Sequence, residues 1–227
     1  MKIGIIGTGM VGKALAGKLV EVGHDVMMGT RNVSQTLSRP EKDRITNQTF
    51  AEWHKQNAKV KLGTFQDAAR HGEVIISATA GAASLDPLKQ AGAANMKGKI
   101  LMEVSNPLDF SKGMPPTLLV CNTDSLGEQI QRTFPDVRVV KTLNTTNASM
   151  MINPGLVANG DHTMFVCGND AGAKTVVAGY LKEWFGWKDI IDLGDITSAR
   201  GMEMLLPIWI RLFGLLKTPA FNFKIVR

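Results

Sequence analysis

Short apolar runs alternate with amphipathic stretches along this chain, and that alternation predicts parallel strands connected by helices. The apolar runs are continuous, as expected of strands that are covered on both faces. We expect strands over residues 2–6, 24–29, 59–62, 73–78, 99–105, 137–143, 162–166 and 190–193. Helical spacing of apolar residues is clear before Gly23, over 123–134 and from 197 onward. The predicted fold class is α/β with a doubly wound, mainly parallel sheet.

The first apolar run leads directly into a glycine-rich turn. Gly7, Gly9 and Gly12 have the G-x-G-x-x-G spacing, and a helical pattern follows them. In such a turn the first glycine permits a tight bend, the second lets a pyrophosphate approach the backbone, and the third lets the helix pack closely on the strand. The free N–H groups at the helix N-terminus also favour phosphate. This strand–turn–helix context predicts a dinucleotide-binding site of the Rossmann type.

The end of the second apolar run indicates which dinucleotide binds. An Asp or Glu at this position would favour NAD by accepting hydrogen bonds from the adenosine ribose. The chain has Gly29-Thr30-Arg31-Asn32 instead. Thr30 offers a hydroxyl, and Arg31 offers a guanidinium that suits a phosphate. We therefore expect NADP(H) rather than NAD, with the alternative that Arg31 only lies on the surface near a helix start.

Small or polar residues follow three further strands. Residues 79–83 are small and leave room for the ribose and diphosphate of a dinucleotide. Ser105 and Asn106 end the fifth strand, where they could hydrogen-bond a nicotinamide carboxamide or ribose, and 144–148 form a polar cluster after the sixth. Ligands bind at the carboxyl ends of strands in doubly wound sheets. Ordinary turns would also explain 79–83 and 144–148.

The last apolar pattern predicts a helix with a wide apolar face that includes Trp209 and Phe213. Such a face belongs to the core or to a dimer interface in preference to the wall of an aromatic substrate pocket. We divide the chain into an NADP-binding Rossmann domain over 1–148 and a small C-terminal helical or αβ region over 149–227, for substrate binding or dimerisation.

Charge and cysteine content narrow the function classes. The net charge is +6, but no run of Lys and Arg is interleaved with aromatic residues, so an anionic cofactor explains the charge better than nucleic acid does. Cys121 and Cys167 lie far apart and outside any Cys/His cluster. This argues against a metal site and predicts two buried free thiols in a reducing compartment.

No stretch of the sequence predicts a membrane span or a signal peptide. The most apolar late stretch, 204–216, contains Pro207 and Arg211 and is too short to cross a bilayer. The apolar run at the N-terminus is interrupted by glycines, unlike the apolar region of a signal peptide. We therefore expect a cytoplasmic protein without membrane partners.

These landmarks resemble the coenzyme F-420-dependent NADP oxidoreductases, also called deazaflavin:NADP reductases. The resemblance covers essentially the full length and implies a homodimer with a Rossmann domain and a small C-terminal domain. The stretches that carry it are 7–12, 29–31, 75–79, 104–107 and 192–200. The resemblance implies that the backbone of Thr8, Gly9, Met10 and Val11 holds the diphosphate, that Thr30 and Arg31 hold the adenosine phosphate, and that Thr79, Ala83, Ser105 and Ala148 line the rest of the dinucleotide.

The predicted reaction is hydride transfer between the nicotinamide and a planar acceptor such as coenzyme F-420 or a flavin. A transfer between two rings depends mainly on position and exclusion of water, which fits a sequence without an obvious catalytic dyad, and we name no catalytic residue.

Two alternatives to this reaction stay open. One is an imine or carbonyl reductase resembling the pyrroline-carboxylate reductases, with Thr145, Thr146 or Tyr180 as proton donor. The other is an NADP(H)-sensing protein without turnover.

Overall fold

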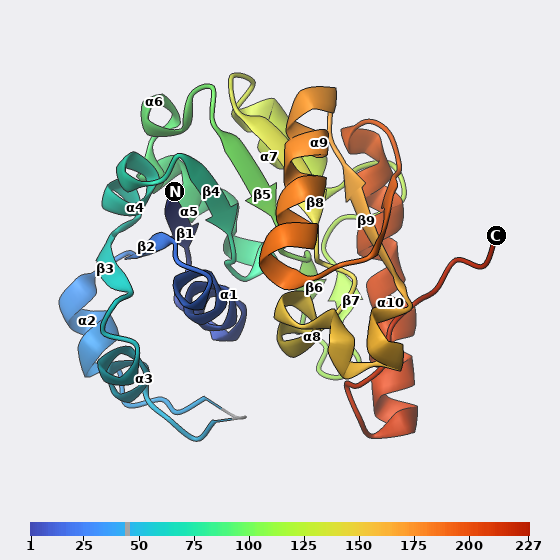
Figure 1. Cartoon of the computed structure of the whole chain (residues 1–227), viewed down its shortest axis with the longest axis horizontal. Coiled ribbons are helices and arrows are strands. Elements are labelled where there is room, and N and C mark those ends of the chain that lie inside the picture. The colour runs from blue at the N-terminus through green and yellow to red at the C-terminus, as the bar shows by residue number, and fades with distance from the viewer. Residues whose placement is uncertain (44–45) are drawn as a thin grey trace.

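A computed structural model describes residues 1–43 and 46–227 and contains an eight-stranded sheet with helices on both faces (Figure 1). The strands of this sheet are β1 (Lys2–Ile6), β2 (Asp25–Thr30), β3 (Lys61–Thr64), β4 (Val74–Ser77), β5 (Ile100–Glu103), β8 (Arg138–Thr142), β9 (Thr163–Cys167) and β10 (Asp189–Asp192). They lie within a few residues of the predicted ranges.

The strand order is β3-β2-β1-β4-β5-β8-β9-β10. Neighbours from β3 to β8 are parallel, β8 and β9 are antiparallel, and β9 and β10 are parallel. The fold class is therefore confirmed as a doubly wound, mainly parallel α/β sheet. Both β9 and β10 come from the C-terminal region, so the sheet continues without a break past residue 148.

Ten α-helices connect and cover the strands in the described part of the chain. They are α1 (Met10–Glu21), α2 (Val33–Ser38), α3 (Phe50–Gln56), α4 (Phe65–His71), α5 (Leu85–Ala91), α6 (Ala93–Met96), α7 (Leu126–Thr133), α8 (Ala148–Ile152), α9 (Ala171–Tyr180) and α10 (Ala199–Leu216). A π-helical turn, Leu181–Phe185, follows α9, and short 3-10 turns cover Gly81–Ala83, Pro154–Leu156, Ala158–Gly160 and Ile196–Ser198. A small antiparallel pair, β6 (Leu108–Asp109) with β7 (Thr117–Leu118), follows β5.

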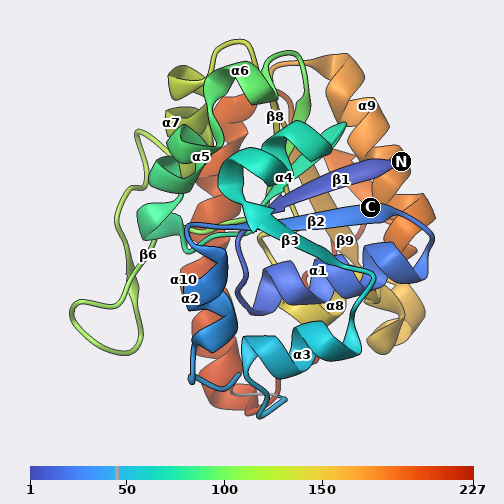
Figure 2. The same ribbon diagram turned by 90° about the vertical axis from the view of Figure 1, so that its left-hand side faces the viewer.

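Helices lie on both sides of the sheet (Figure 2). Side chains of α1, α3, α8 and α9 form the core on one face, and those of α4, α5, α7 and the first half of α10 form it on the other. Examples are Leu15, Trp53, Met151 and Val177 on the first face and Ala68, Leu88, Ile130 and Met202 on the second. All four residues of β4 are buried, which explains why its sequence is apolar without alternation.

The N-terminus of α1 differs from those of the helices around it. The side chains of Thr49, Thr64 and Ser125 cap α3, α4 and α7, whereas α1 begins after Gly9 with no side-chain cap. The first N–H groups of a helix need a partner. Those of α1 are therefore left for a ligand or for water.

One expectation changes with the structure, and another is refined. The prediction that both thiols are buried was wrong for Cys121, which is exposed in the loop before α7, whereas Cys167 is buried in β9. The final helix is core only in its first half, since Ile208 and Leu215 are 52% and 76% exposed. Among the described residues, no helix is long and apolar enough to cross a membrane.

Candidate functional site

The glycine-rich turn after β1 has the shape that a close ligand requires. Gly7 has φ +123° and donates its N–H to the carbonyl of Gly29 at 3.0 Å. A Cβ at Gly12 would lie 2.5 Å from the Gly7 carbonyl oxygen, whereas a Cβ at Gly9 would meet nothing within 4 Å. The fold therefore needs glycine at 7 and 12, while Gly9 leaves an open approach to the N-terminus of α1.

The residues after three strands lie along one edge of the sheet. The ladder continues past the strand ends, because Ala78 donates to the Ile6 carbonyl at 2.9 Å and Val104 donates to the Ser77 carbonyl at 3.2 Å. The segments that follow β1, β4 and β5 consequently leave the sheet side by side. A Cβ at Gly81 would come within 1.9 Å of the Asn106 carbonyl oxygen, so the loops after β4 and β5 touch through their backbones.

A cavity of about 460 Å³ opens at this edge. It is lined by Gly9, Met10, Val11, Ala78, Thr79, Ala80, Gly81, Val104, Ser105, Asn106, Leu108, Thr146, Asn147, Ala148, Met151 and Trp209. Predicted site residues from the turn after β1 and from the loops after β4, β5 and β8 therefore share one cavity. Met151 and Trp209 add walls from α8 and α10, which makes this a cavity built by both halves of the chain.

The other predicted site residues lie outside that cavity. Thr30 is buried and shares a 2.6 Å hydrogen bond with the Thr36 hydroxyl. Arg31 is exposed and forms a 3.2 Å ion pair with Asp86 of α5. Ala83 lines a separate hollow of about 210 Å³.

Thr8 lies in a smaller hollow of about 280 Å³ beside the glycine-rich turn. The side chain of Arg39 also lines this hollow, and the sequence did not predict it as a site residue. Arg39, at the end of α2, donates to the Thr8 hydroxyl at 3.5 Å and lies over the Phe50 ring. Lys13 also lines the hollow and pairs with Asp43 at 2.8 Å. Arg39 follows Arg31 by eight residues in a polar stretch without a motif, so only the fold brings it back to the turn.

Reciprocal hydrogen bonds fix the end of β5 at the cavity. The Asn144 amide donates to the Asn106 side-chain oxygen at 2.9 Å, and the Asn106 amide donates to the Asn144 carbonyl at 2.8 Å. Asn147 caps α8 by accepting from the backbone of Ser149 and Met150. The polar cluster after β8 therefore has structural roles, and Asn144 sets the orientation of Asn106.

Of the candidate proton donors Thr146 and Tyr180, only Thr146 lines the cavity. Thr146 lines the cavity, and its hydroxyl has no hydrogen-bond partner among the described residues. Tyr180 stacks on Trp184 with ring centroids 3.9 Å apart and is not part of the cavity lining. Burial raises the pKa of the Tyr180 hydroxyl, so the side chain stays a neutral phenol near neutral pH.

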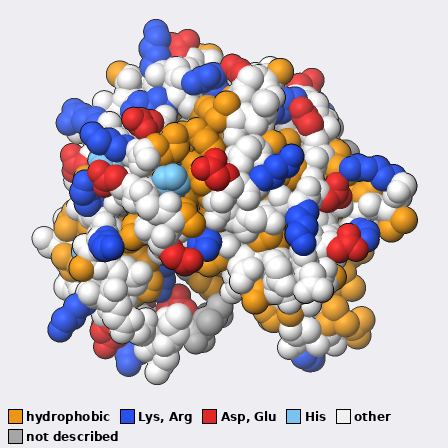
Figure 3. Space-filling model, in the orientation of Figure 1, with side chains coloured by type: hydrophobic (Ala, Val, Ile, Leu, Met, Phe, Trp, Pro, Cys, Tyr) orange, Lys and Arg blue, Asp and Glu red, His pale blue; other side chains and the backbone are white. Residues whose placement is uncertain are grey.

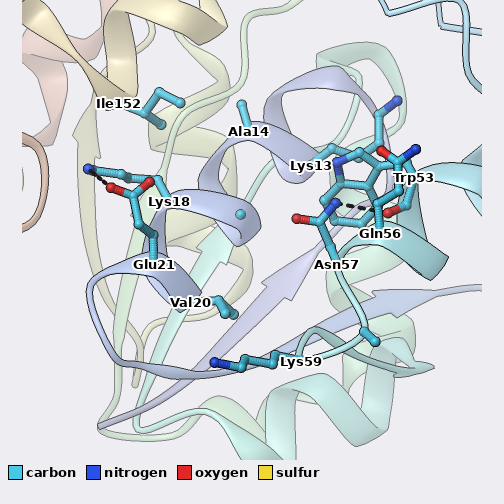
Figure 4. Close-up of a pocket in the computed structure, with 12 residues that line it drawn as sticks. Lys13, Ala14, Lys18, Val20, Glu21, Trp53, Gln56, Asn57, Lys59 and Ile152 are labelled. Carbon is cyan, nitrogen blue, oxygen red and sulfur yellow. Dashed lines mark hydrogen bonds and ion pairs between the residues drawn. The ribbon is translucent and has the colours of Figure 1, made fainter.

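A larger depression of about 660 Å³ lies elsewhere, over the outer side of α1 (Figure 4). Trp53 and Asn57 line it from α3 and the residue after it, and Ile152 lines it from α8. Lys18 and Glu21 pair with each other at its rim. It includes neither the glycine-rich turn nor a strand end, so the smaller cavity at the sheet edge is the candidate site.

Three comparisons with known proteins identify relatives of this chain. Residues 2–107 match the family model described as "NADP oxidoreductase coenzyme F420-dependent". A crystal structure from Arthrobacter sp. FB24, provisionally described as an F420-dependent NADP reductase, is 56% identical with a TM-score of 0.96 and covers 100% of both chains.

More distant curated relatives match over most of this chain. The F420-dependent NADP reductase of Methanothermobacter marburgensis is 28% identical over 93% of this chain and 92% of its own length. Metalloreductase STEAP3 of Rattus norvegicus is 29% identical over 92% of this chain, which spans only 38% of that relative. With a 56% identical relative aligned over its full length, the chain belongs to the family of coenzyme F420-dependent NADP oxidoreductases.

Proposed function

We propose that this protein binds NADP(H) along the carboxyl edge of its sheet and transfers a hydride between the nicotinamide and a planar acceptor such as a deazaflavin or a flavin. The observation that carries the proposal is the cavity in which the glycine-rich turn, the ends of β4 and β5, and Trp209 meet. The openness at Gly9 and the uncapped start of α1 fit a diphosphate.

The phosphate that distinguishes NADP(H) from NAD(H) would lie beside the end of β2. Thr30 is the last residue of that strand and Arg31 follows it, and Thr8 belongs to the turn bonded to the strand through Gly7 and Gly29. Arg39 offers a second guanidinium next to Thr8. Two guanidinium groups and two hydroxyls form a donor set that suits a phosphate dianion.

The reactive end of the cofactor would lie toward Ser105, Asn106 and Ala148. When bound, the nicotinamide supplies or takes up the hydride. The residues of the chain then orient the ring and exclude water, with Met151 and Trp209 as apolar walls. We propose the division into 1–148, which would hold the cofactor, and 149–227, which would complete the acceptor side.

A cofactor titration tests the phosphate site. Arg31→Ala should weaken NADPH binding by about 1–3 kcal/mol and leave NADH binding unchanged, because a charge-assisted hydrogen bond to the extra phosphate is lost. Arg70→Ala is the matched control, since Arg70 is an exposed arginine of α4 that donates a hydrogen bond to Asn95. Equal losses for NADPH and NADH in Arg31→Ala would rule out the phosphate role.

A turnover assay tests the acceptor. The protein and NADPH are mixed with a deazaflavin, a flavin and a cyclic imine, and loss of NADPH is followed by stopped flow. Oxidation with the deazaflavin or the flavin supports the proposal, and oxidation with the imine alone supports an imine reductase. Tight NADPH binding with no oxidation in any mixture would instead identify a sensor.

We also propose a homodimer formed through the second half of α10. Ile208, Phe213, Leu215 and Leu216 are each at least 41% exposed there. Hydrophobic side chains gather at the lower right of Figure 3, over this part of α10. Contiguous exposed apolar surface of this kind is typical of a protein interface.

A further inference from the structure

Three ionisable side chains lie fully buried behind the end of β5, and the proposed hydride transfer uses none of them directly. Glu103, Lys141 and Glu203 come from β5, β8 and α10, and each is 0% exposed. The Lys141 ammonium donates to both carboxylates, at 2.8 Å in the case of Glu203. Burial alone would lower the pKa of Lys141, but the two carboxylates together raise it, so the ammonium stays charged.

This cluster holds the backbone of Ser105 from both sides. The third hydrogen bond of the Lys141 ammonium goes to the Ser105 carbonyl at 2.6 Å. The Ser105 N–H donates to the Glu103 carboxylate at 2.7 Å. An ammonium has three donors, and all three of Lys141 are used. The Lys141 side chain therefore has one defined position in the fold.

The same cluster fixes α10 against the sheet. Glu203 accepts from the N–H groups of Leu126 and Gly127, at 2.9 and 3.1 Å, at the start of α7. The Met202 carbonyl next to it accepts from the Asn144 amide at 3.1 Å. Trp209 lies six residues after Glu203 in α10, or about 9 Å along the helix axis, and lines the cavity together with Ser105 and Asn106.

Stability alone does not account for charges in this place. Replacing a buried ion pair with apolar residues of similar volume is often neutral or stabilising, because the desolvation penalty of the charges is removed. What apolar side chains cannot reproduce is the set of directed hydrogen bonds that ties Ser105 to α10. The retained charges therefore point to a requirement for position.

We propose that Lys141 is a positioning residue for the reactive end of the cavity, holding the Ser105–Asn106 strand end and the Trp209-bearing helix α10 at a fixed separation. This rests on the proposed function in one respect, namely that the nicotinamide occupies this end. The adenosine end, at Thr8, Thr30 and Arg31, lies outside the contacts of Lys141. Loss of Lys141 should therefore weaken the hold on the nicotinamide and spare the hold on the adenosine phosphate.

Two ligands test this separation, NADPH and its fragment 2′,5′-ADP, which lacks the nicotinamide. Dissociation constants for both are measured by titration calorimetry on the full chain, with thermal melting as a check of folding. In Lys141→Met, we expect the preference for NADPH over 2′,5′-ADP to fall about 10-fold, with 2′,5′-ADP binding within about two-fold of wild type. An unchanged preference, whether or not both affinities fall together, overturns the proposal.

Lys174→Met is the matched control, because Lys174 is also largely buried and bonds Asp192 and the Gly194 carbonyl away from the cavity. Its preference should equal that of wild type, and a matching fall in this control would also overturn the proposal. If Lys141→Met does not fold, Glu203→Gln keeps the volume but removes the negative charge and one of the two acceptor oxygens that Lys141, Leu126 and Gly127 share, so it weakens the contact with Lys141. We expect the preference to fall about three-fold in that variant, and no change would be decisive against the positioning role. Wild-type protein that binds neither ligand would instead refute the proposed cofactor.

Discussion

At the level of single residues, Arg31 is held by a carboxylate that competes with the proposed phosphate. Arg31 and Asp86 are 68% and 61% exposed in their side chains, and such surface pairs contribute about 0–1 kcal/mol. Breaking the pair before binding would reduce NADPH affinity by the same small amount. We therefore predict that Asp86→Asn tightens NADPH binding by up to about five-fold and leaves NADH unchanged. Parallel titrations check this, and weaker NADPH binding in the variant would contradict it.

The two cysteines should differ sharply in reactivity. Cys121 is exposed, whereas Cys167 is 0% exposed and its burial raises the pKa of its thiol to about 12. The thiolate is the nucleophile that attacks such reagents, and Cys167 does not form it near pH 8. We predict that a disulfide reagent such as DTNB modifies one thiol in the folded protein and two in denaturant. Cys121→Ser should abolish the reaction of the folded state, and two fast thiols in the folded protein would contradict the burial of Cys167.

At the scale of elements, two glycines of the glycine-rich turn serve different purposes: the fold requires Gly12, and the proposed cofactor requires Gly9. A Cβ at position 12 collides with the Gly7 carbonyl at 2.5 Å, whereas a Cβ at position 9 meets no atom within 4 Å. We predict that Gly12→Ala lowers the melting temperature, while Gly9→Ala melts like wild type but loses NADPH affinity by at least about 10-fold. Thermal melts and titrations of the two variants check this. Normal NADPH affinity in a folded Gly9→Ala protein would show that no diphosphate approaches Gly9.

The elements also show how far the sequence predicts this fold. The strands and the turn after β1 follow from apolar runs and glycine spacing, because both are local signals. The antiparallel direction of β9 does not, since an apolar run of five residues has no direction. Arg39 escaped prediction for a related reason, because its approach to Thr8 depends on how α2 and α3 fold over the turn. Lys141 resembles a surface lysine in sequence, and only its pairing with Glu103 across β5 and β8 makes it a core residue.

At the scale of the whole molecule, the candidate site does not belong to one half of the chain. Gly9, Thr79 and Ser105 line it from the first 148 residues, and Met151 and Trp209 line it from the rest. The sheet itself also continues into the second half through β9 and β10. The C-terminal region should therefore affect turnover through the shape of the cavity, even where it makes no contact with the adenosine end.

The exposed half of α10 yields the last prediction, which concerns assembly. Leu215 is 76% exposed and Ile208 is 52% exposed. Contact of such apolar side chains with water is unfavourable, and a partner chain that buries them removes this cost. We predict that sedimentation equilibrium gives twice the 24.6 kDa mass of one chain, and that Leu215→Glu shifts the protein to a monomer that still binds NADPH. Leu156→Glu is the control, since Leu156 is 58% exposed in a 3-10 turn away from α10. A monomeric wild type would refute the dimer, and a dimer that withstands Leu215→Glu but dissociates with Leu156→Glu would assign the interface to another surface.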